Sequence, residues 1–221
     1  MIKKIVSYFI PIKIHSVNST ISKSIEVIWS NGELVMDSEN ANYSYGSLQR
    51  ILKIGLKTIG FDRIRAMESV LVLGVAGGSV IKTLVHEIKF KGKITGVEID
   101  SDIIAIANQY FKLDEIEQLE IVIDDAFEFV LKTKEKHDFI IIDVFQDTTM
   151  PNFLFEAFFT DKICLLLKSK GVILFNTMLL NEKHNDRNSK YIEEFNNTYY
   201  VVKLIPRVEK HNELIVIEKK Y

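Results

Sequence analysis

A glycine-containing loop and a carboxylate twenty residues further along the chain have the types and spacing for ligand chemistry. The apolar run 70–73 leads into Gly74, Gly77 and Gly78, and the next apolar run ends on Glu98. Glycines let a backbone turn sharply and approach a ligand closely. A carboxylate that ends the following strand can accept hydrogen bonds from ribose hydroxyls. The pattern predicts a nucleoside-binding site, and the alternative is a tight strand-to-helix turn that binds nothing.

The loop departs from the glycine pattern of dinucleotide-binding proteins. The pattern G-x-G-x-x-G would place glycine at positions 76 and 79, where this chain has Ala76 and Ser79. Those glycines serve close approach to a pyrophosphate and tight packing of the helix that follows. Their absence counts against a dinucleotide as the ligand.

More carboxylates follow later apolar runs. Asp124 and Asp125 come directly after residues 121–123, and Asp143 closes the run 139–142. In a parallel sheet the carboxyl ends of the strands lie along one edge, so we expect these acids to converge with Glu98. Each also has a structural interpretation: Asp124 or Asp125 caps a helix that begins at Ala126, and Asp143 is a strand-end turn residue.

Strand and helix patterns alternate through most of the chain, which predicts a parallel sheet covered by helices on both faces. Strands are expected near 70–74, 93–98, 119–123, 138–143 and 171–176, and helices near 79–89, 101–111, 125–133 and 154–168. A polar helix at 186–197 and strands at 199–205 and 213–218 follow, joined by a connection that begins at Pro206. Consecutive strands of this kind pair antiparallel. A mostly parallel sheet with a C-terminal antiparallel hairpin is typical of the Rossmann-like S-adenosylmethionine-dependent methyltransferase fold.

The N-terminal part reads differently. Residues 24–29 and 33–36 flank Asn31-Gly32, which is typical of a hairpin with a type I′ turn. A helix is expected from 47 to 59. We therefore divide the chain into an N-terminal β-hairpin subdomain, 1–46, and a Rossmann-like catalytic domain, 47–221. The hairpin is too small to be stable alone, so we expect it to pack on the catalytic domain or on a second copy of the chain, covering the acceptor side of the site.

Composition narrows the partners. The net charge of −2 over 221 residues provides no electrostatic footprint for nucleic acid, and no apolar run approaches the length of a membrane span. We expect neither nucleic acid nor a membrane as partner, and a cytoplasmic location.

Cys164 lies in an apolar run and is expected in the core rather than as a nucleophile. The histidines lack metal-ligand spacing, so we expect no metal and place them on the surface or in loops: His15, His86, His137, His184 and His211.

Several motifs together resemble the spermidine synthase (polyamine aminopropyltransferase) family over about two thirds of the chain. The matching segments are L-V-M-D (34–37), V-L-V-L-G-V-A-G-G-S (70–79), V-E-I-D (97–100), I-D-D-A-F-E-F (123–129) and I-I-I-D (140–143). The resemblance implies a homodimer and a small N-terminal β subdomain. It also implies that Glu98 binds ribose, that Asp125 binds the adenine amino group and that Asp143 lies beside the reacting centre.

The chain departs from that family where the family holds cationic amines. Ala76 replaces an aspartate in the loop, Gln146 replaces the second aspartate of D-S-S-D, and Tyr45-Gly46-Ser47 is the nearest counterpart of Y-H-E. Decarboxylated S-adenosylmethionine ends in an ammonium group that needs a carboxylate partner, whereas intact S-adenosylmethionine ends in a zwitterion. We therefore expect intact S-adenosylmethionine as donor, with methyl transfer to a small-molecule acceptor. Asp147 could replace the lost acid if the loop is shifted by one residue.

These arguments define a predicted site. Asp143 is expected to orient or deprotonate the acceptor. The cofactor-binding residues are expected to be Gly74, Ala76, Gly77, Gly78, Ser79, Glu98, Asp124, Asp125 and Ala126; the acceptor-binding residues are Tyr45, Phe145, Gln146 and Asp147. Phe145 and Phe153 are candidates for the acceptor pocket, whereas the other phenylalanines nearby are expected to face the core: Phe155, Phe158 and Phe159. The alternatives are aminopropyl transfer from decarboxylated S-adenosylmethionine and a non-catalytic nucleoside-binding protein.

Overall fold

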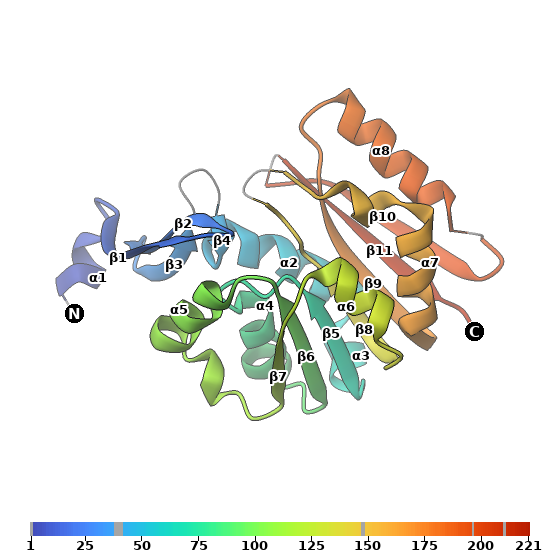
Figure 1. Cartoon of the computed structure of the whole chain (residues 1–221), viewed down its shortest axis with the longest axis horizontal. Coiled ribbons are helices and arrows are strands. Elements are labelled where there is room, and N and C mark those ends of the chain that lie inside the picture. The colour runs from blue at the N-terminus through green and yellow to red at the C-terminus, as the bar shows by residue number, and fades with distance from the viewer. Residues whose placement is uncertain (1, 38–41, 147–148, 196, 210) are drawn as a thin grey trace.

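Residues 69–219 contain a seven-stranded sheet in the order β10–β11–β9–β8–β5–β6–β7 (Figure 1). The computed structural model describes residues 2–37, 42–146, 149–195, 197–209 and 211–221. The strands are β5 Ser69–Leu73, β6 Lys93–Glu98, β7 Leu119–Ile123, β8 His137–Ile142, β9 Leu167–Met178, β10 Tyr200–Val208 and β11 Asn212–Lys219. Strands β5 to β9 are parallel, and β11 pairs antiparallel with both β9 and β10. The predicted fold class is confirmed.

The strand order reverses at β5. From β5 the chain runs outward to β6 and β7, then returns to add β8 on the other side of β5. Open α/β sheets bind ligands at such a switch point, beyond the carboxyl ends of the strands. Gly74 follows β5, Glu98 ends β6 and Asp143 follows β8, so the topology places the loop and both acids at this edge.

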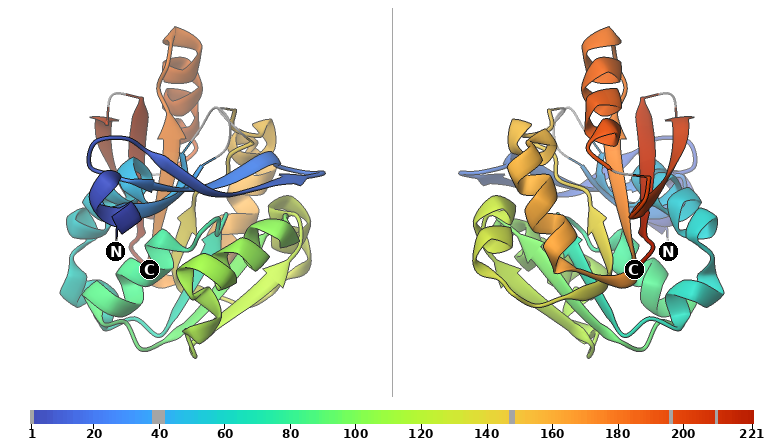
Figure 2. Two further views of the ribbon diagram at one scale, coloured as in Figure 1. Left: turned by 90° about the vertical axis from the view of Figure 1, so that its left-hand side faces the viewer. Right: turned by 90° about the vertical axis from the view of Figure 1, so that its right-hand side faces the viewer.

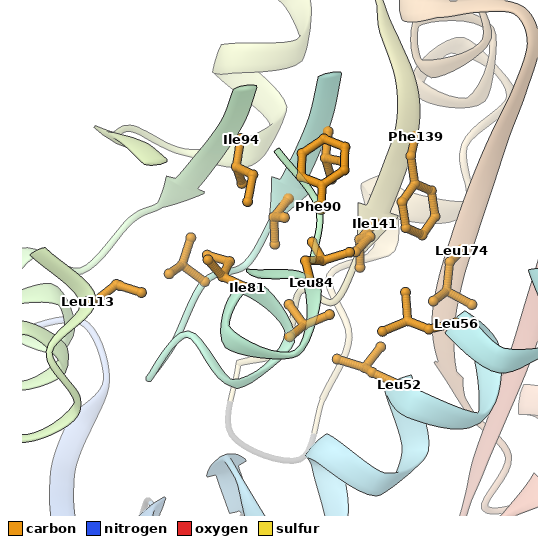
Figure 3. Packing of buried hydrophobic residues seen from close by; sticks show 14 of the residues in the cluster. Leu52, Leu56, Ile81, Leu84, Phe90, Ile94, Leu113, Phe139, Ile141 and Leu174 are labelled. Carbon is orange, nitrogen blue, oxygen red and sulfur yellow. The ribbon is translucent and has the colours of Figure 1, made fainter. Parts of the chain in front are cut away.

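Helices cover both faces of the sheet. They are α2 Gly46–Ile59, α3 Phe61–Arg65, α4 Ser79–Lys82, its π-helical continuation η1 Thr83–Ile88, α5 Ser101–Phe111, the 3₁₀ turn η2 Leu113–Glu115, α6 Ala126–Lys132, the 3₁₀ turn η3 Asn152–Phe155, α7 Ala157–Leu166 and α8 Glu182–Glu193. Alternate residues of β5 face opposite ways: Val70 and Val72 join a core with α2, α4 and α5, and Leu71 and Leu73 join a core with α6 and α7. Figure 3 shows the first of these cores, in which Leu52 and Leu56 of α2 lie near Leu174 of β9. None of the described helices is both long and apolar enough to cross a bilayer.

The N-terminal segment forms a second, four-stranded antiparallel sheet. After a short helix α1, Ile2–Val6, the strands are β1 Ile12–Ser19, β2 Lys23–Ser30, β3 Glu33–Asp37 and β4 Asn42–Ser44. Asn31 and Gly32 have φ of 50° and 78°, as a type I′ turn requires. Ile25, Val27 and Met36 join the α2-side core of the large sheet. Figure 2 shows the β1–β2 hairpin lying across one end of that sheet. The β2–β3 hairpin was predicted, whereas α1, β1 and β4 were not.

The helix predicted at 79–89 is present, and it changes from α-helical to π-helical at Thr83. Three other predicted elements have wrong boundaries. The helix predicted at 154–168 divides into η3 and α7. The helix predicted to start at 186 starts at Glu182, because the Asn181 side chain caps it by accepting from the backbone N–H of His184 at 3.1 Å. Pro206 lies within β10 and does not begin the connection.

Two side-chain placements were also wrong. His137 is 1% exposed, because it begins β8 inside the sheet and does not lie in a loop. Phe158 is 56% exposed, since α7 presents Phe159 to the core and turns Phe158 outward. Phe155 and Phe159 do pack against core aromatic rings, as expected.

Candidate active site

The glycine loop is shaped by close contacts with two other segments. Gly74 has φ of 84°, and a Cβ there would collide with the carbonyl oxygen of Asp143, so the ends of β5 and β8 approach each other because residue 74 has no side chain. A Cβ at Gly77 would lie 2.8 Å from Cβ of Ser44 and 3.2 Å from Cε2 of Tyr45. The loop is therefore packed beneath the junction of β4 and α2. Between the two glycines, Ala76 has φ of 47°, a left-handed conformation rare for alanine.

Glu98 is buried, and its carboxylate holds the glycine loop. Oε2 accepts from the backbone N–H groups of Val75 and Ala76 at 3.1 and 3.0 Å, and Oε1 accepts from the N–H of Asp100 at 3.2 Å. Burial raises the pKa of Glu98, opposed by these hydrogen bonds. A carboxylate has about four acceptor positions, so after three backbone bonds one position remains for a ligand donor. Glu98 is placed both to shape the loop and to meet a hydroxyl.

Asp124 and Asp125 follow β7 at the start of α6. Asp125 Oδ1 accepts from the backbone N–H groups of Phe127 and Glu128 at 2.8 and 3.3 Å, which caps the helix that starts at buried Ala126. This is the structural interpretation considered from the sequence. Both capping bonds use Oδ1; within the described chain Oδ2 accepts no hydrogen bond, so capping and ligand binding are compatible. Asp124 instead accepts from the N–H of Asp125 at 2.9 Å.

Two exposed isoleucines beside these acids were missed from the sequence. Ile99 follows Glu98 and is 40% exposed, and Ile123 precedes the aspartate pair and is 50% exposed. Glu98 and Ile123 are register partners in adjacent strands, so the two isoleucines belong to one edge of the sheet. The combination of apolar surface and carboxylate acceptors fits a flat base attached to a sugar. An apolar residue directly next to each strand-end acid was the available signal.

Asp143 is half-buried beyond β8. Its backbone N–H donates to the carbonyl oxygen of Leu73 at 2.9 Å, and its Oδ1 accepts from Nδ2 of Asn176 at 2.8 Å. Burial raises the pKa of Asp143 to about 6, against the hydrogen bond from Asn176 and with a contribution from the negative charge of Glu98. A carboxyl group with a pKa near neutrality can accept a proton from a bound nucleophile.

The predicted acceptor residues belong to two segments, the start of α2 and the loop after β8. Tyr45 lies over Gly77 and stacks on Phe111 with ring centroids 4.5 Å apart; its buried hydroxyl has no hydrogen-bond partner among the described residues, and burial raises its pKa. Gln146 exchanges backbone hydrogen bonds with Thr149, at 2.8 and 3.0 Å, in the loop after β8. The prediction for Asp147 falls outside the described residues.

The phenylalanines near this loop pack mainly on one another. Phe145 is half-buried against the α6–α7 core. Phe153 contacts Phe127 and Phe159 edge to face, with ring centroids 5.3 and 5.0 Å apart. These contacts account for Phe153 as an aromatic core residue, and its assignment to an acceptor pocket stays a prediction.

Serine hydrogen bonds attach the N-terminal sheet to the site. Ser44 Oγ accepts from the backbone N–H of Ser79 at 3.3 Å, at the start of α4. Ser19 Oγ donates to Oδ2 of Asp100 at 2.6 Å, just after Glu98. Neither serine was singled out from the sequence, because each is distant along the chain from its partner.

Comparison with known proteins bears on the family and on the fold. A polyamine aminopropyltransferase of Vibrio vulnificus is 28% identical over 135 residues, which are 60% of this chain and 45% of that protein, so the chain spans about half the length of this curated relative. A spermidine synthase solved with the transition-state analogue AdoDATO superposes with a TM-score of 0.70 at 20% identity, covering 95% of this chain and 72% of that one. Human methyltransferase-like protein 13, solved with SAH, superposes with a TM-score of 0.65 at 21% identity, covering 80% of this chain and 83% of that one. The sequence profile of the spermine/spermidine synthase domain matches residues 49–221, and the chain belongs to that family.

Proposed function

We propose that this chain binds intact S-adenosylmethionine and transfers its methyl group to a small-molecule acceptor. The nucleoside half of such a donor fits the edge formed by β5, β6 and β7. Glu98 has one acceptor position left for a ribose hydroxyl, Asp125 Oδ2 is available to an amino group, and Ile99 and Ile123 offer apolar surface to a base. Structural neighbours of this chain were solved with SAH and with AdoDATO, which agrees with a ligand of this class.

The observation that favours intact S-adenosylmethionine as donor is the lack of a carboxylate in the glycine loop. Ala76 is half-buried at the bend of the loop, and the nearby carboxylate of Glu98 is already engaged by three backbone N–H groups. Among the described loop residues, 74–79, none carries a carboxylate. An ammonium tail without an opposite charge loses the solvation it had in water, whereas the zwitterionic tail of S-adenosylmethionine also presents a carboxylate that backbone N–H groups can bind.

In this proposal, the chain catalyses the transfer by positioning donor and acceptor and by supplying one proton acceptor, Asp143. The bound sulfonium supplies the activated methyl carbon. Asp143, at the switch point beside Gly74, is placed to accept a hydrogen bond from the acceptor nucleophile and to take its proton. Tyr45 covers the loop from the N-terminal side. Holding donor and acceptor in line supplies much of the rate enhancement in reactions of this kind.

Calorimetric titration of the full chain with S-adenosylmethionine, decarboxylated S-adenosylmethionine and methylthioadenosine tests the proposal. We expect S-adenosylmethionine to bind at least tenfold more tightly than the decarboxylated form, a difference of about 1.4 kcal/mol. Methylthioadenosine, which lacks the charged tail, reports on the nucleoside half alone. Tighter binding of the decarboxylated donor would overturn the methyl assignment. If none of the three compounds binds, both the methyl-transfer and the aminopropyl-transfer assignments are contradicted.

Aminopropyl transfer is the second candidate, favoured by the family and by the relative named a polyamine aminopropyltransferase. In that case Asp143 would share the binding of a cationic amine with Asp147. The two candidates separate in one assay, in which the chain is incubated with decarboxylated S-adenosylmethionine and putrescine. We expect little or no spermidine, and efficient formation of spermidine would establish aminopropyl transfer.

A further inference from the structure

Asn176 is a fully buried amide that contacts the proposed proton acceptor. It lies near the end of β9, with an exposed fraction of 0%. Its Nδ2 donates to Oδ1 of Asp143 at 2.8 Å, although the two residues are 33 positions apart. A buried amide that donates to a carboxylate favours the charged form of that carboxylate and fixes its rotamer.

The orientation of the Asn176 amide is set by a third residue. Oδ1 of Asn176 accepts from Nδ2 of Asn212 at 2.9 Å, and Asn212 begins the neighbouring strand β11. Because Asn212 occupies the oxygen, the nitrogen of Asn176 is left to face Asp143. The antiparallel pairing of β11 with β9 therefore determines which end of the amide the carboxylate meets.

The next residue along β9 belongs to a separate network. Thr177 is also fully buried, and its hydroxyl donates to the carbonyl oxygen of Glu213 at 2.9 Å and accepts from Nδ2 of Asn188 at 3.1 Å. Successive residues of a strand point to opposite faces. Thr177 is consequently a neighbour with the same burial that does not touch Asp143, which makes it a matched control.

We propose that Asn176, oriented by Asn212, is the positioning residue for Asp143. It occupies Oδ1, leaves Oδ2 to the acceptor, and keeps the pKa of the half-buried carboxyl low enough for it to be charged at neutral pH. This assignment rests on the proposed role of Asp143 in the transfer reaction. Asn176 acts through Asp143 and is not itself placed in contact with donor or acceptor.

The test is the titration of Asp143 in the full chain, followed by ¹³C NMR of protein labelled at aspartate carboxyl groups. The Asp143 signal is assigned by its loss in Asp143→Asn. In Asn176→Leu we expect the pKa of Asp143 to rise by about one unit, because burial is then opposed by one hydrogen bond fewer. Asn212→Leu, which leaves the amide free to turn, should give a smaller rise in the same direction. Thr177→Val should leave the titration of Asp143 unchanged.

Each outcome decides the assignment. An unshifted Asp143 in folded Asn176→Leu overturns it, and so does a shift of equal size in Thr177→Val. If Asn176→Leu does not fold, Asn212→Leu decides in the same way. Titration of the parent chain with S-adenosylmethionine separates this inference from the proposed function: absence of binding there contradicts the function, while the coupling between Asn176 and Asp143 is measured without donor or acceptor.

Discussion

Ser19 donates a 2.6 Å hydrogen bond to Asp100, across 81 positions of sequence, and both side chains are buried. The other oxygen of Asp100 accepts from the backbone N–H of Asp102 at 2.9 Å and caps α5, while the N–H of Asp100 donates to Glu98. Burial acts to raise the pKa of Asp100, but hydrogen bonds from Ser19 and others outweigh it and the pKa is lowered. The turn between β1 and β2, the start of α5 and the Glu98 carboxylate therefore form one hydrogen-bonded unit.

Removing this link should affect both stability and binding. Ser19→Ala leaves a buried carboxylate oxygen of Asp100 without its donor, so we expect the free energy of unfolding to fall by about 1–3 kcal/mol in urea denaturation. Binding of S-adenosylmethionine should weaken in parallel, since Asp100 also holds Glu98. Ser16→Ala, at an exposed position of the same strand, is the control. Equal stability of the two variants would contradict the importance of the link.

Glu98 is expected to matter for the nucleoside through its charge as well as its shape. Glu98→Gln keeps the side-chain length but presents an amide nitrogen where the carboxylate accepts backbone N–H groups. We expect it, like Glu98→Ala, to weaken binding of methylthioadenosine by about 1–3 kcal/mol in calorimetry. Glu120→Gln, on the exposed part of β7, should bind as the parent does. Parent-like affinity in folded Glu98→Ala would remove Glu98 from the binding site.

Restoring an acid in the loop should change the donor preference. At φ of 47° residue 76 is in a conformation that aspartate and asparagine tolerate better than alanine, so neither Ala76→Asp nor Ala76→Asn should impair folding. We expect Ala76→Asp to shift the ratio of affinities toward decarboxylated S-adenosylmethionine by about tenfold, the effect of roughly one charged hydrogen bond. Ala76→Asn introduces a side chain of the same shape as aspartate without its charge, so it should leave the ratio of affinities unchanged. If Ala76→Asp and Ala76→Asn give the same ratio, the charge of residue 76 does not act on the donor tail.

Because His137 is buried, we expect the free energy of unfolding to fall in acid. Neither ring nitrogen has a hydrogen-bond partner among the described residues, and burial lowers the pKa of the ring, with Lys168 and Lys93 also lowering it against Glu135 and Asp138. Below an ordinary histidine pKa of about 6.5 the unfolded chain takes up a proton that the folded chain excludes, so the free energy of unfolding falls as the pH falls.

The matched measurement is urea denaturation of the parent and His137→Leu between pH 5 and 8. The variant should be more stable by about 1–3 kcal/mol at neutral pH, because a buried polar ring without partners is removed. Its advantage should grow below pH 6.5. The difference between the two proteins isolates His137 from Asp143, whose raised pKa contributes the opposite pH dependence between about 4 and 6. A constant or shrinking difference would contradict the assignment.

The sequence by itself determined the parallel sheet and the edge at which ligands bind. Apolar runs followed by Gly74, Glu98 and Asp143 are local signals, and parallel pairing of such strands brings their carboxyl ends together whatever the loops do. The Asn31-Gly32 turn was equally local, because both residues must adopt positive φ. The same reasoning could not find β1 and β4, whose pairing depends on partners elsewhere in the sheet and not on a pattern of their own.

Only the tertiary structure decided which polar side chains face one another. Asn176 and Thr177 are adjacent in sequence, yet one meets Asp143 and the other meets Glu213, since β9 presents them to opposite faces and β11 completes both networks. His137 is buried because β8 lies between β5 and β9, which its own neighbours in sequence do not reveal. Side-chain direction in a strand alternates with a period of two, so a partner is fixed only when the register of the neighbouring strand is known.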